Sequence, residues 1–332
     1  MGNALKGKVA VVTGSGQGIG RAIAICLAVE GAKVITNNRK PGSTGFAIMN
    51  EALVKSLSTE QKEWLRKEAA AANGDAATTA QAIKDIGGEA VPFFGDVTNF
   101  EVARQLIQTA VDSFGTIDIL VNVVGTFRFS AIWEMSEEDW DYVCNVKPKA
   151  HFNCIRHALP FMMKQRWGRI INCSSGAASG GPLRQVNYSA ANAGVLGLTY
   201  GVATEVYPYG ITCNAFAPDA RTRASFELTA YEMAAPAEKG PWVDNQHKIP
   251  LGNSPSPDDL APFIAYLATE EAGYISGSAF FVGGPYVGMW SNAEIAKSLT
   301  KYGGRWTVDE LKQQVPGALL RGYRSPAAPR PD

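Results

Sequence analysis

The sequence lacks an excess of charge, because its 31 basic residues balance its 31 acidic residues and leave a formal net charge of zero. It also has no long run of like charges, so electrostatics gives no reason to expect binding to nucleic acid or to an anionic membrane surface. No apolar run reaches the length of a membrane-spanning helix, and no secretory leader is recognisable before the first expected strand. We therefore expect a cytoplasmic protein without nucleic-acid or membrane partners.

Metal-binding and disulfide patterns are also missing. The three histidines form neither an HxH nor an HExxH pattern, and the five cysteines are scattered through apolar segments without CxxC spacing. We expect no metal site, and reduced, buried thiols. Hydrophobic residues make up 46% of the chain and charged residues only 19%, which favours a large buried core over disorder.

Short apolar strands alternate with helical segments along most of the chain. The pattern predicts strands at 9–12, 33–36, 90–94, 117–121, 169–173, 212–215 and 279–282, and helices at 21–30, 101–114, 137–164, 190–205 and 257–268. Continuous apolar strands separated by helices are typical of a parallel sheet that is covered on both faces. The predicted fold class is therefore α/β, a doubly wound parallel sheet.

An insertion at about 41–74 interrupts this alternation after the second strand. Its first half carries one helical stripe of apolar residues, namely Phe46, Met49, Leu53 and Leu57. The sequence Ser58-Thr-Glu-Gln61 resembles a capping box and predicts a second helix through Ala72. The insertion leaves the strand near a possible cofactor site, so it could cap a cofactor, build a subunit interface or be a passive surface helix pair.

The end of the chain also stands outside the alternation. We expect a main domain over 1–284 and a C-terminal extension over 285–332. Within the extension, Ser291–Glu294 and Thr307–Glu310 are capping-box patterns that each predict a short helix.

A glycine-rich loop follows the first strand and opens the first helix. It reads Thr13-Gly-Ser-Gly-Gln-Gly-Ile-Gly20. In this position Gly14 permits a tight turn, Gly18 lets the backbone approach a pyrophosphate, and Gly20 allows close packing of helix and strand. The free N–H groups and the positive dipole end of the helix favour a phosphate there. The loop predicts a Rossmann-type site for a nicotinamide dinucleotide, and the alternative is a plain glycine-rich turn.

The end of the second strand bears on which dinucleotide is bound. Proteins that prefer NAD place an acidic residue there to bind the ribose hydroxyls. Here the stretch Thr36–Lys40 has no carboxylate, and Arg39 could pair with a 2′-phosphate. We therefore predict NADP as the cofactor and NAD as the second choice. The alternative is that Arg39 is a solvated loop charge.

The glycine-rich octapeptide resembles the TGxxxGxG motif of the short-chain dehydrogenase/reductase family. Further motifs follow in family order: Asp96-Val97, a degenerate NNAG turn at Asn122–Gly125, Asn145, Ser174-Ser175, Tyr188 at thirteen residues after Ser175, and Asn214–Pro218 with Thr222 beyond it. The resemblance covers about 6–40 and 75–284. Within the family, the segments 185–191 and 279–290 are most similar to the (R)-3-hydroxyacyl-CoA dehydrogenase domain of peroxisomal multifunctional enzymes.

The resemblance implies the roles of the site residues. Tyr188 would exchange a proton with the substrate oxygen, Ser175 would hydrogen-bond that oxygen, and Asn145 would hold a water of the proton relay. The residues implied to bind the cofactor are Gly14, Ser15, Gln17, Gly18, Ile19, Gly20, Asn38, Arg39, Asp96, Val97, Asn122, Gly125, Tyr188, Asn192, Pro218 and Thr222. The family also implies a homodimer or homotetramer.

Position 192 departs from the family pattern YxxxK, because Asn192 stands where the lysine is expected. On a helix, residues i and i+4 share a face, so Asn192 should still lie beside Tyr188 and could grip the ribose. An uncharged amide offers no opposite charge to lower the ordinary pKa of about 10 of a phenol, so we expect the ionised form of Tyr188 to be scarcer than in the family. Three interpretations stay open: an inactive variant, a slow or specialised reductase, or a scaffold that performs no net redox chemistry.

The segment at about 219–247 is where the family keeps its substrate lid. Its large apolar residues are Phe226, Leu228, Tyr231, Met233 and Trp242. They predict a bulky, partly apolar substrate, although core packing would explain them equally well. Together these features predict an NADP(H)-dependent oxidoreductase that interconverts a ketone and a secondary alcohol. The alternatives are a cofactor-binding pseudoenzyme that acts as a partner subunit, and a lyase or dehydratase on the same scaffold.

Overall fold

The computed structural model describes residues 2–42, 57–71, 74–180, 184–225, 255–292 and 294–323. Three predicted features therefore lie outside the described residues. They are the first part of the stripe at 46–53, most of the predicted lid, and the end of the C-terminal extension.

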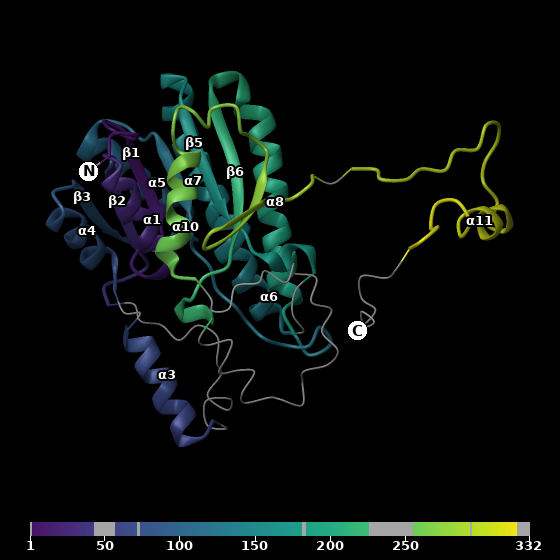
Figure 1. Cartoon of the computed structure of the whole chain (residues 1–332), viewed down its shortest axis with the longest axis horizontal. Helices are drawn as coiled ribbons and strands as arrows, with labels where there is room; N and C mark the ends of the chain where they lie inside the picture. The colour runs from purple at the N-terminus through teal and green to yellow at the C-terminus, as the bar shows by residue number, and fades with distance from the viewer. Residues whose placement is uncertain are drawn as a thin grey trace.

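An eight-stranded sheet forms the centre of the described fold (Figure 1). Its strands are β1 (Val9–Thr13), β2 (Lys33–Asn38), β3 (Ala90–Phe94), β4 (Ile119–Asn122), β5 (Gly168–Cys173), β6 (Ile211–Pro218), β7 (Ala279–Gly283) and β8 (Tyr286–Met289). They lie in the order β3-β2-β1-β4-β5-β6-β7-β8. The first seven run parallel, which confirms the predicted doubly wound sheet. The prediction missed β8, an antiparallel edge strand that follows a tight turn in which Gly284 has a φ of 58°.

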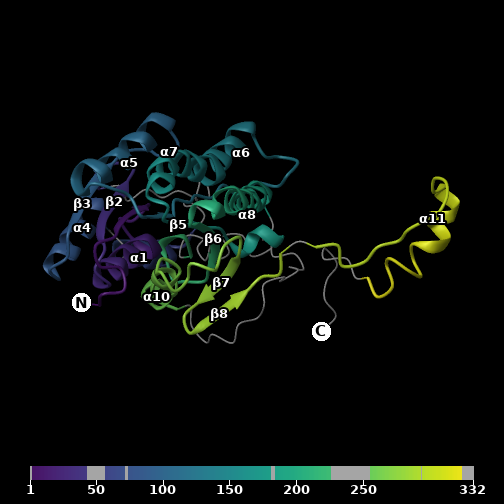
Figure 2. The same cartoon turned by 90° about the horizontal axis from the view of Figure 1, so that it is seen from above.

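Helices cover both faces of the sheet, as the view from above shows (Figure 2). The helices are α1 (Gly18–Val29), α3 (Thr59–Ala71), α4 (Ala76–Asp85), α5 (Phe100–Phe114), α6 (Glu137–Cys144), α7 (Ala150–Gln165), α8 (Val186–Val206), α10 (Pro257–Leu267) and α11 (Val308–Gln314). One apolar core joins α1, α4 and α10 to the sheet, and a second core joins α5, α7 and α8 to its other face.

The helix α5 illustrates how sequence sets these elements. Asn99 caps its N-terminus by accepting from the backbone N–H groups of Glu101 and Val102, and Gly115 ends it with a φ of 87°. Its buried residues recur at helical spacing, so one face packs on the sheet. These buried residues are Ala103, Leu106, Ile107 and Ala110.

The predicted helix over 137–164 is interrupted. Helix α6 ends at Cys144, a π-helical segment η1 covers Asn145–Lys149, and α7 continues from Ala150. Pro148 lies inside η1. Because proline has no N–H and its ring crowds the carbonyl one turn earlier, the helix widens at this point.

Two capping boxes were predicted in the C-terminal extension, and one of them begins a helix in the described residues. Thr307 and Glu310 form a complete capping box at the start of α11. The helix predicted after Ser291–Glu294 is absent, because the described residues 294–300 are not helical. Ile295 in that stretch is 87% exposed, so it provides no buried apolar contact that would stabilise a short helix. The extension leads away from the sheet in both views (Figures 1 and 2).

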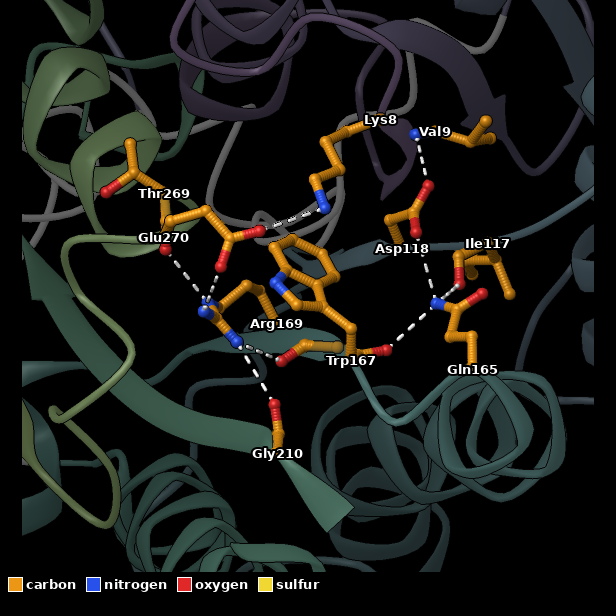
Figure 3. A network of polar contacts seen from close by, with 11 residues as sticks. Lys8, Val9, Ile117, Asp118, Gln165, Trp167, Arg169, Gly210, Thr269 and Glu270 are labelled. Atoms are coloured by element: carbon orange, nitrogen blue, oxygen red, sulfur yellow. Dashed lines mark hydrogen bonds and ion pairs between the residues drawn. The ribbon is translucent and has the colours of Figure 1, made fainter.

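The starts of the parallel strands are locked together by buried polar groups (Figure 3). Asp118, just before β4, accepts from the backbone N–H of Val9 at 2.8 Å. The amide of Gln165 donates to the other carboxylate oxygen of Asp118 and to the carbonyl of Trp167. The first residues of β1, β4 and β5 are thereby held in register.

Arg169 completes this network from the start of β5. Its side chain is 3% exposed and donates to the carbonyls of Thr269 and Gly210 at 3.0 and 3.3 Å. It also stacks on the ring of Trp167 and lies 3.9 Å from a carboxylate oxygen of Glu270 (Figure 3). One guanidinium therefore joins the segments that precede β6 and follow α10.

Replacing Arg169 should destabilise the fold without altering the opposite edge of the sheet, where the parallel strands end. We expect Arg169→Met to lower the free energy of unfolding by about 2–4 kcal/mol, because buried carbonyls lose their donor. Glu270→Gln, which changes a mostly exposed carboxylate, should cost less than about 1 kcal/mol. Urea unfolding of both variants checks this, and equal effects of the two substitutions would contradict it.

Candidate active site

A cavity of about 1510 Å³ opens along the carboxyl edge of the sheet. Its lining runs from Arg39 after β2 to Tyr188 and Thr222 on the other side. Strand β1 lies where the strand order reverses, and open α/β sheets bind ligands at such a point. All the predicted site residues line this cavity except Ser15, Asn122 and Asn192.

The glycine-rich loop forms one wall of the cavity. Gly14 and Gly18 have φ values of 64° and 52°, a region that favours glycine. A Cβ on Gly20 would overlap the carbonyl oxygen of Gly14, whereas a Cβ on Gly18 would meet only the side chain of Thr222 at 3.6 Å. Gly20 thus allows the turn to pack on α1, and Gly18 leaves the loop open toward the cavity.

Ser15 acts behind this wall. Its Oγ donates to the carbonyl of Val12 at 2.7 Å and accepts from the backbone N–H of Asn37 at 2.8 Å. The side chain therefore ties the loop to the end of β2. Ser15 is fully buried, so its side chain supports the loop from behind, and its predicted contact with the cofactor stays a prediction.

The loop and its surroundings fit a dinucleotide. No side chain caps the first turn of α1, so its N–H groups face the loop without a side-chain partner. Two buried acceptor atoms, Gln17 Oε1 and Asn38 Oδ1, have no hydrogen-bond partner among the described residues. Both residues line the cavity, and ribose hydroxyl groups could donate to such acceptors.

The adenosine end lies at the tips of β2 and β3. Arg39 is exposed there, and Asp96 and Val97 line the same part of the wall. Asp96 accepts from the backbone N–H of Thr98 at 3.0 Å, which orders the turn after β3. No carboxylate is found at the end of β2 itself, in agreement with the sequence.

The insertion begins and ends at this same place. The backbone N–H of Gly42 donates to the carboxylate of Asp75 at 3.0 Å, which closes the insertion at its base. A Cβ on Gly74 would lie 2.5 Å from the carbonyl oxygen of Gly16, so the returning chain rests on the glycine-rich loop. The predicted helix within it is α3, and its capping box joins Ser58 and Gln61.

Tyr188 and Ser175 meet at the other end of the cavity. Ser175 precedes the short 3-10 helix η2 (Gly176–Ser179), and Tyr188 lies in the first turn of α8. Phe127 packs on the phenol with ring centroids 4.4 Å apart. Burial raises the pKa of Tyr188 well above its ordinary value, and hydrogen bonds with the side chains of Ser175 and Asn192 offset only part of that rise.

Asn192 does not reach the cavity lining. Its Nδ2 donates to the backbone carbonyl of Tyr188 at 2.8 Å, and its backbone carbonyl accepts from Ser174 Oγ at 3.0 Å. Its Oδ1 is buried without a partner among the described residues. The predicted grip on the ribose would therefore require the side chain to rotate away from its own helix.

Asn145 and the degenerate NNAG turn lie between these two ends. Asn145 lines the cavity at the point where α6 gives way to η1. Asn122 is buried behind the lining and donates to Asn172 Oδ1 at 2.9 Å, which joins β4 to β5. Gly125 lines the cavity. Within this turn, Gly125 therefore forms part of the cavity surface, and Asn122 supports that surface from behind.

Pro218 and Thr222 lie at the end of β6 and just beyond it, on the far side of the cavity. Pro218 is the last residue of that strand, and Thr222 accepts from and donates to Ser225 in the next turn. Thr222 lies beside Gly18, so the segment after β6 closes over the glycine-rich loop. Only its first residues, through Ser225, belong to the described part of the chain.

Lys147 is a buried residue of this site that the sequence reasoning missed. Its side chain is 2% exposed, lines the cavity, and donates from Nζ to the carbonyl of Cys173 at 2.8 Å. A signal was available in the sequence. Val143, Lys147 and His151 recur at four-residue spacing, which places a lysine on an otherwise buried helical face.

The described residues contain neither a cluster of metal ligands nor a membrane-spanning helix. No group of three or more histidine, cysteine, aspartate or glutamate side chains converges there as metal ligands would. None of the helices described is both long enough and apolar enough to cross a bilayer. The five cysteines are free thiols, of which Cys154, Cys173 and Cys213 are buried.

Comparison with known proteins identifies the family. The sequence model described as "short chain dehydrogenase" matches residues 49–227, which is more than half of the chain. The chain belongs to the short-chain dehydrogenase family. Like other members, it is an NAD(P)-dependent oxidoreductase, and this confirms the predicted family, fold class and enzyme class.

Individual relatives cover nearly the whole of this short-chain dehydrogenase. It is 34% identical to a 3-oxoacyl-[acyl-carrier-protein] reductase of Synechocystis sp., over 86% of this chain and 98% of the relative. It is 32% identical to the hydroxyacyl-CoA dehydrogenase ChsB1 of Mycobacterium tuberculosis, over 96% of this chain and 89% of that one. The crystal structure of a short chain dehydrogenase from Mycobacterium avium superposes with a TM-score of 0.73 at 32% identity, covering 95% of each chain.

The packing of Gly20 on Gly14 should be required for dinucleotide binding. We expect Gly20→Ala to weaken NADPH binding about ten- to a hundredfold, because a methyl group forced into this contact costs about 1–3 kcal/mol. Gly201→Ala is the matched control, since a Cβ there meets nothing within 4 Å on an exposed face of α8. Fluorescence titration with NADPH measures both variants, and undiminished binding by Gly20→Ala would contradict the assignment of this loop.

Proposed function

We propose that this short-chain dehydrogenase reduces a 3-oxoacyl thioester to the 3-hydroxyacyl thioester with NADPH. The observation that carries the proposal is the buried Tyr188 hydroxyl. It is hydrogen-bonded with the Ser175 side chain in a cavity that continues to the glycine-rich loop. A dinucleotide laid along that cavity from the loop would bring its nicotinamide end toward Tyr188.

Tyr188 and Ser175 can carry the proton chemistry of this reaction. When bound, the cofactor supplies a hydride to the carbonyl carbon. Ser175 Oγ would hydrogen-bond the substrate oxygen, and the Tyr188 hydroxyl would give that oxygen a proton. Phe127 and the protein behind it keep the phenol 8% exposed, which limits the access of water to the proton-transfer step.

The raised pKa of Tyr188 keeps this residue in the protonated form that the reduction step uses. Burial raises the pKa of Tyr188, so the phenol is protonated throughout the neutral pH range. A protonated phenol is the form that donates a proton to a carbonyl oxygen. Oxidation of the alcohol needs the ionised form, which is scarce.

The cofactor preference follows from the end of β2. Arg39 is exposed on the wall of the adenosine end, and no acidic residue accompanies it on that strand. A guanidinium suits a 2′-phosphate, whereas the hydroxyl pair of NAD would find only the amide of Asn38. We therefore infer that the enzyme uses NADPH in preference to NADH.

The substrate class is inferred from the relatives. One is a reductase of 3-oxoacyl chains carried on acyl carrier protein, and the other a dehydrogenase of hydroxyacyl-CoA. The first name specifies an oxo group at the 3-position of an acyl thioester, and the second a hydroxyl group on an acyl thioester. A bulky, partly apolar acyl chain agrees with the large apolar residues of the segment 219–247. Assembly into a homodimer or homotetramer and a cytoplasmic location are also proposed.

Loss of the Tyr188 hydroxyl tests the catalytic proposal. We expect Tyr188→Phe to lower kcat for 3-oxoacyl thioester reduction about 10²- to 10⁴-fold while NADPH still binds. In the native enzyme, the rate of alcohol oxidation should rise with pH as Tyr188 ionises, and the rate of reduction should not. Steady-state kinetics in both directions measure this. If the native chain binds NADPH but reduces no 3-oxoacyl thioester, the proposed substrate class is wrong.

Removal of the Arg39 charge tests the cofactor preference. We expect Arg39→Ser to weaken NADPH binding about tenfold and to leave NADH binding unchanged, because a single charge-assisted hydrogen bond to phosphate is lost. Lys40→Ser removes the same charge from the next exposed residue and serves as the control. Equal binding of NADH and NADPH by the native chain would overturn the preference.

A further inference from the structure

The C-terminal extension presents apolar side chains that the rest of its own chain does not cover. In the part described over 294–323, here called the arm, no residue is buried. Its exposed large apolar residues include Tyr302, which is 94% exposed, and Ile295, Val308, Leu320 and Tyr323. Apolar side chains gathered on one exposed segment mark an interaction surface. The arm therefore lacks the packing partner that its apolar residues need.

The arm is held in shape by contacts within itself. Lys301 donates from Nζ to both carboxylate oxygens of Glu310, at 2.7 and 2.8 Å, and Lys297 donates to the carbonyl of Arg321 at 2.6 Å. Among the described residues, each hydrogen bond and ion pair of the arm joins two of its own residues. Helix α11 has only seven residues, and a helix of that length is marginal in water without tertiary packing.

The arm does not lie on its own main domain. In both views it leads away from the sheet, and α11 stands apart from the other labelled helices (Figures 1 and 2). Within the described part of the chain, the last hydrogen bonds from the extension to the main domain come before the arm. The backbone N–H of Trp290 donates to the carbonyl of Ala279, and the Asn292 amide donates to the carbonyl of Gly277. The apolar residues beyond them are available to a second molecule.

A complementary surface lies at the start of helix α6. It combines three exposed apolar side chains with three exposed carboxylates, and we call it the α6 patch. Its members are Ile132, Trp133, Glu137, Glu138, Trp140 and Asp141. Trp133 is 82% exposed. The three carboxylates form no ion pair with any residue that the structure describes, so their negative charge is uncompensated.

Two ion pairs and a hydrogen bond hold the α6 patch in place. Glu134 pairs with Arg184 at 3.7 Å, and Asp139 pairs with Arg128 at 3.4 Å. The amide of Asn187, at the start of α8, donates to the carbonyl of Asp139 at 3.2 Å. Arg128 also lines the cavity. The patch is therefore a fixed surface next to the cavity wall.

Charge makes the arm and the α6 patch complementary. The extension over 285–332 carries seven basic and four acidic residues, whereas residues 1–284 carry 24 basic and 27 acidic residues. In the arm, Arg305 and Arg321 are exposed, and neither has an ion-pair partner among the residues described. Complementary charge selects which surfaces associate. One chain thus carries both halves of a contact that it does not make with itself.

A second copy of the chain can supply the missing half. When two copies meet around a twofold axis, the same contact is made twice, so each arm can cover the partner's patch. Stable interfaces commonly use about 20–30 residues a side, which the arm and its mirror contact can provide. We propose that the arm of one copy docks on the α6 patch of a second copy, with its arginines facing the three carboxylates.

This contact goes beyond the chemistry of the proposed function and requires only that copies of the chain assemble. It would also bear on the cavity. Tyr142 of α6 lines the cavity, and the Arg128 guanidinium lies 4.2 Å from the centre of its ring. A docked arm would therefore support, from the partner, an element that forms part of the cavity wall.

Cross-linking between isotope-labelled chains tests the contact directly. The full-length chain is prepared with normal and with heavy nitrogen, the two forms are mixed while dilute and concentrated together, and a carbodiimide joins neighbouring amines and carboxylates. We expect peptides that link Lys297 or Lys312 of the arm to Glu138 of the patch, with mixed-label pairs as abundant as single-label pairs. Single-label links alone would mean that the arm folds onto its own chain. A lack of any such link would mean that the arm does not dock there, and either result overturns the inference.

A charge-swap experiment tests whether charge complementarity carries the contact. Arg305→Glu with Arg321→Glu reverses the arm, and Glu137→Lys with Asp141→Lys reverses the patch, while both variants keep Glu138. Each variant alone should give about tenfold fewer links to Glu138, because exposed ion pairs are replaced by repulsion.

The matched control places the same change of charge outside both surfaces. Lys6→Glu with Lys84→Glu reverses two exposed lysines there and should leave the yield of links unchanged. Thermal unfolding of every variant shows whether the fold is retained.

Mixing the two reversed variants restores opposite charges only between copies. The patch-reversed chain keeps a native arm and the arm-reversed chain keeps a native patch, so links between them should return to the native yield. If the mixture gives no more links than the separate variants, the inference is wrong. These measurements need neither substrate nor cofactor. They therefore decide the role of the arm whether or not the chain reduces 3-oxoacyl thioesters.

Discussion

A phenol that is removed from water holds its proton more tightly, and this constraint governs the whole site. Tyr188 is packed against Phe127 and meets water with only 8% of its surface. Its chemistry therefore depends on which groups the fold brings to its hydroxyl. Ser175 contributes a hydrogen bond, whereas Asn192 contributes an amide without charge. A site built in this way suits proton donation better than proton removal, unless a cation from another element takes part.

The two edges of the sheet have different roles. The edge at the strand starts stabilises the fold, and the edge at the strand ends forms the binding cavity. At the strand starts, Arg169 and Asp118 bind backbone groups of neighbouring strands and leave little space between them. At the strand ends, the loops diverge around a large cavity, and buried atoms such as Gln17 Oε1 find no partner in the part of the chain that the structure describes. A polar network that is satisfied at one edge can thus support unsatisfied donors and acceptors at the other, where a ligand completes them.

Much of the fold could be predicted from local pattern. Seven strands and the main helices follow from apolar periodicity, and α11 follows from the capping box of Thr307 and Glu310, because these signals act within a few residues. The predictions that failed did so because of contacts between elements, which local patterns do not contain. Strand β8 exists because β7 offers it an edge to pair with, and the predicted helix at 294 is absent in a stretch where Ile295 is left exposed rather than packed. The interruption at Pro148 was visible in the sequence, but its π geometry was not.

The sequence by itself determined the glycine-rich loop, the Ser175–Tyr188 pair and the uncharged residue at 192, since each is fixed by residue identity and spacing. Only the tertiary structure decided which buried side chains join them in the cavity wall. Lys147 stands between Gly125 and Cys173 because a π segment, a turn and a strand converge there, although the three are far apart in sequence. Burial and electrostatic coupling depend on such distances in space, and no local pattern along the chain contains them.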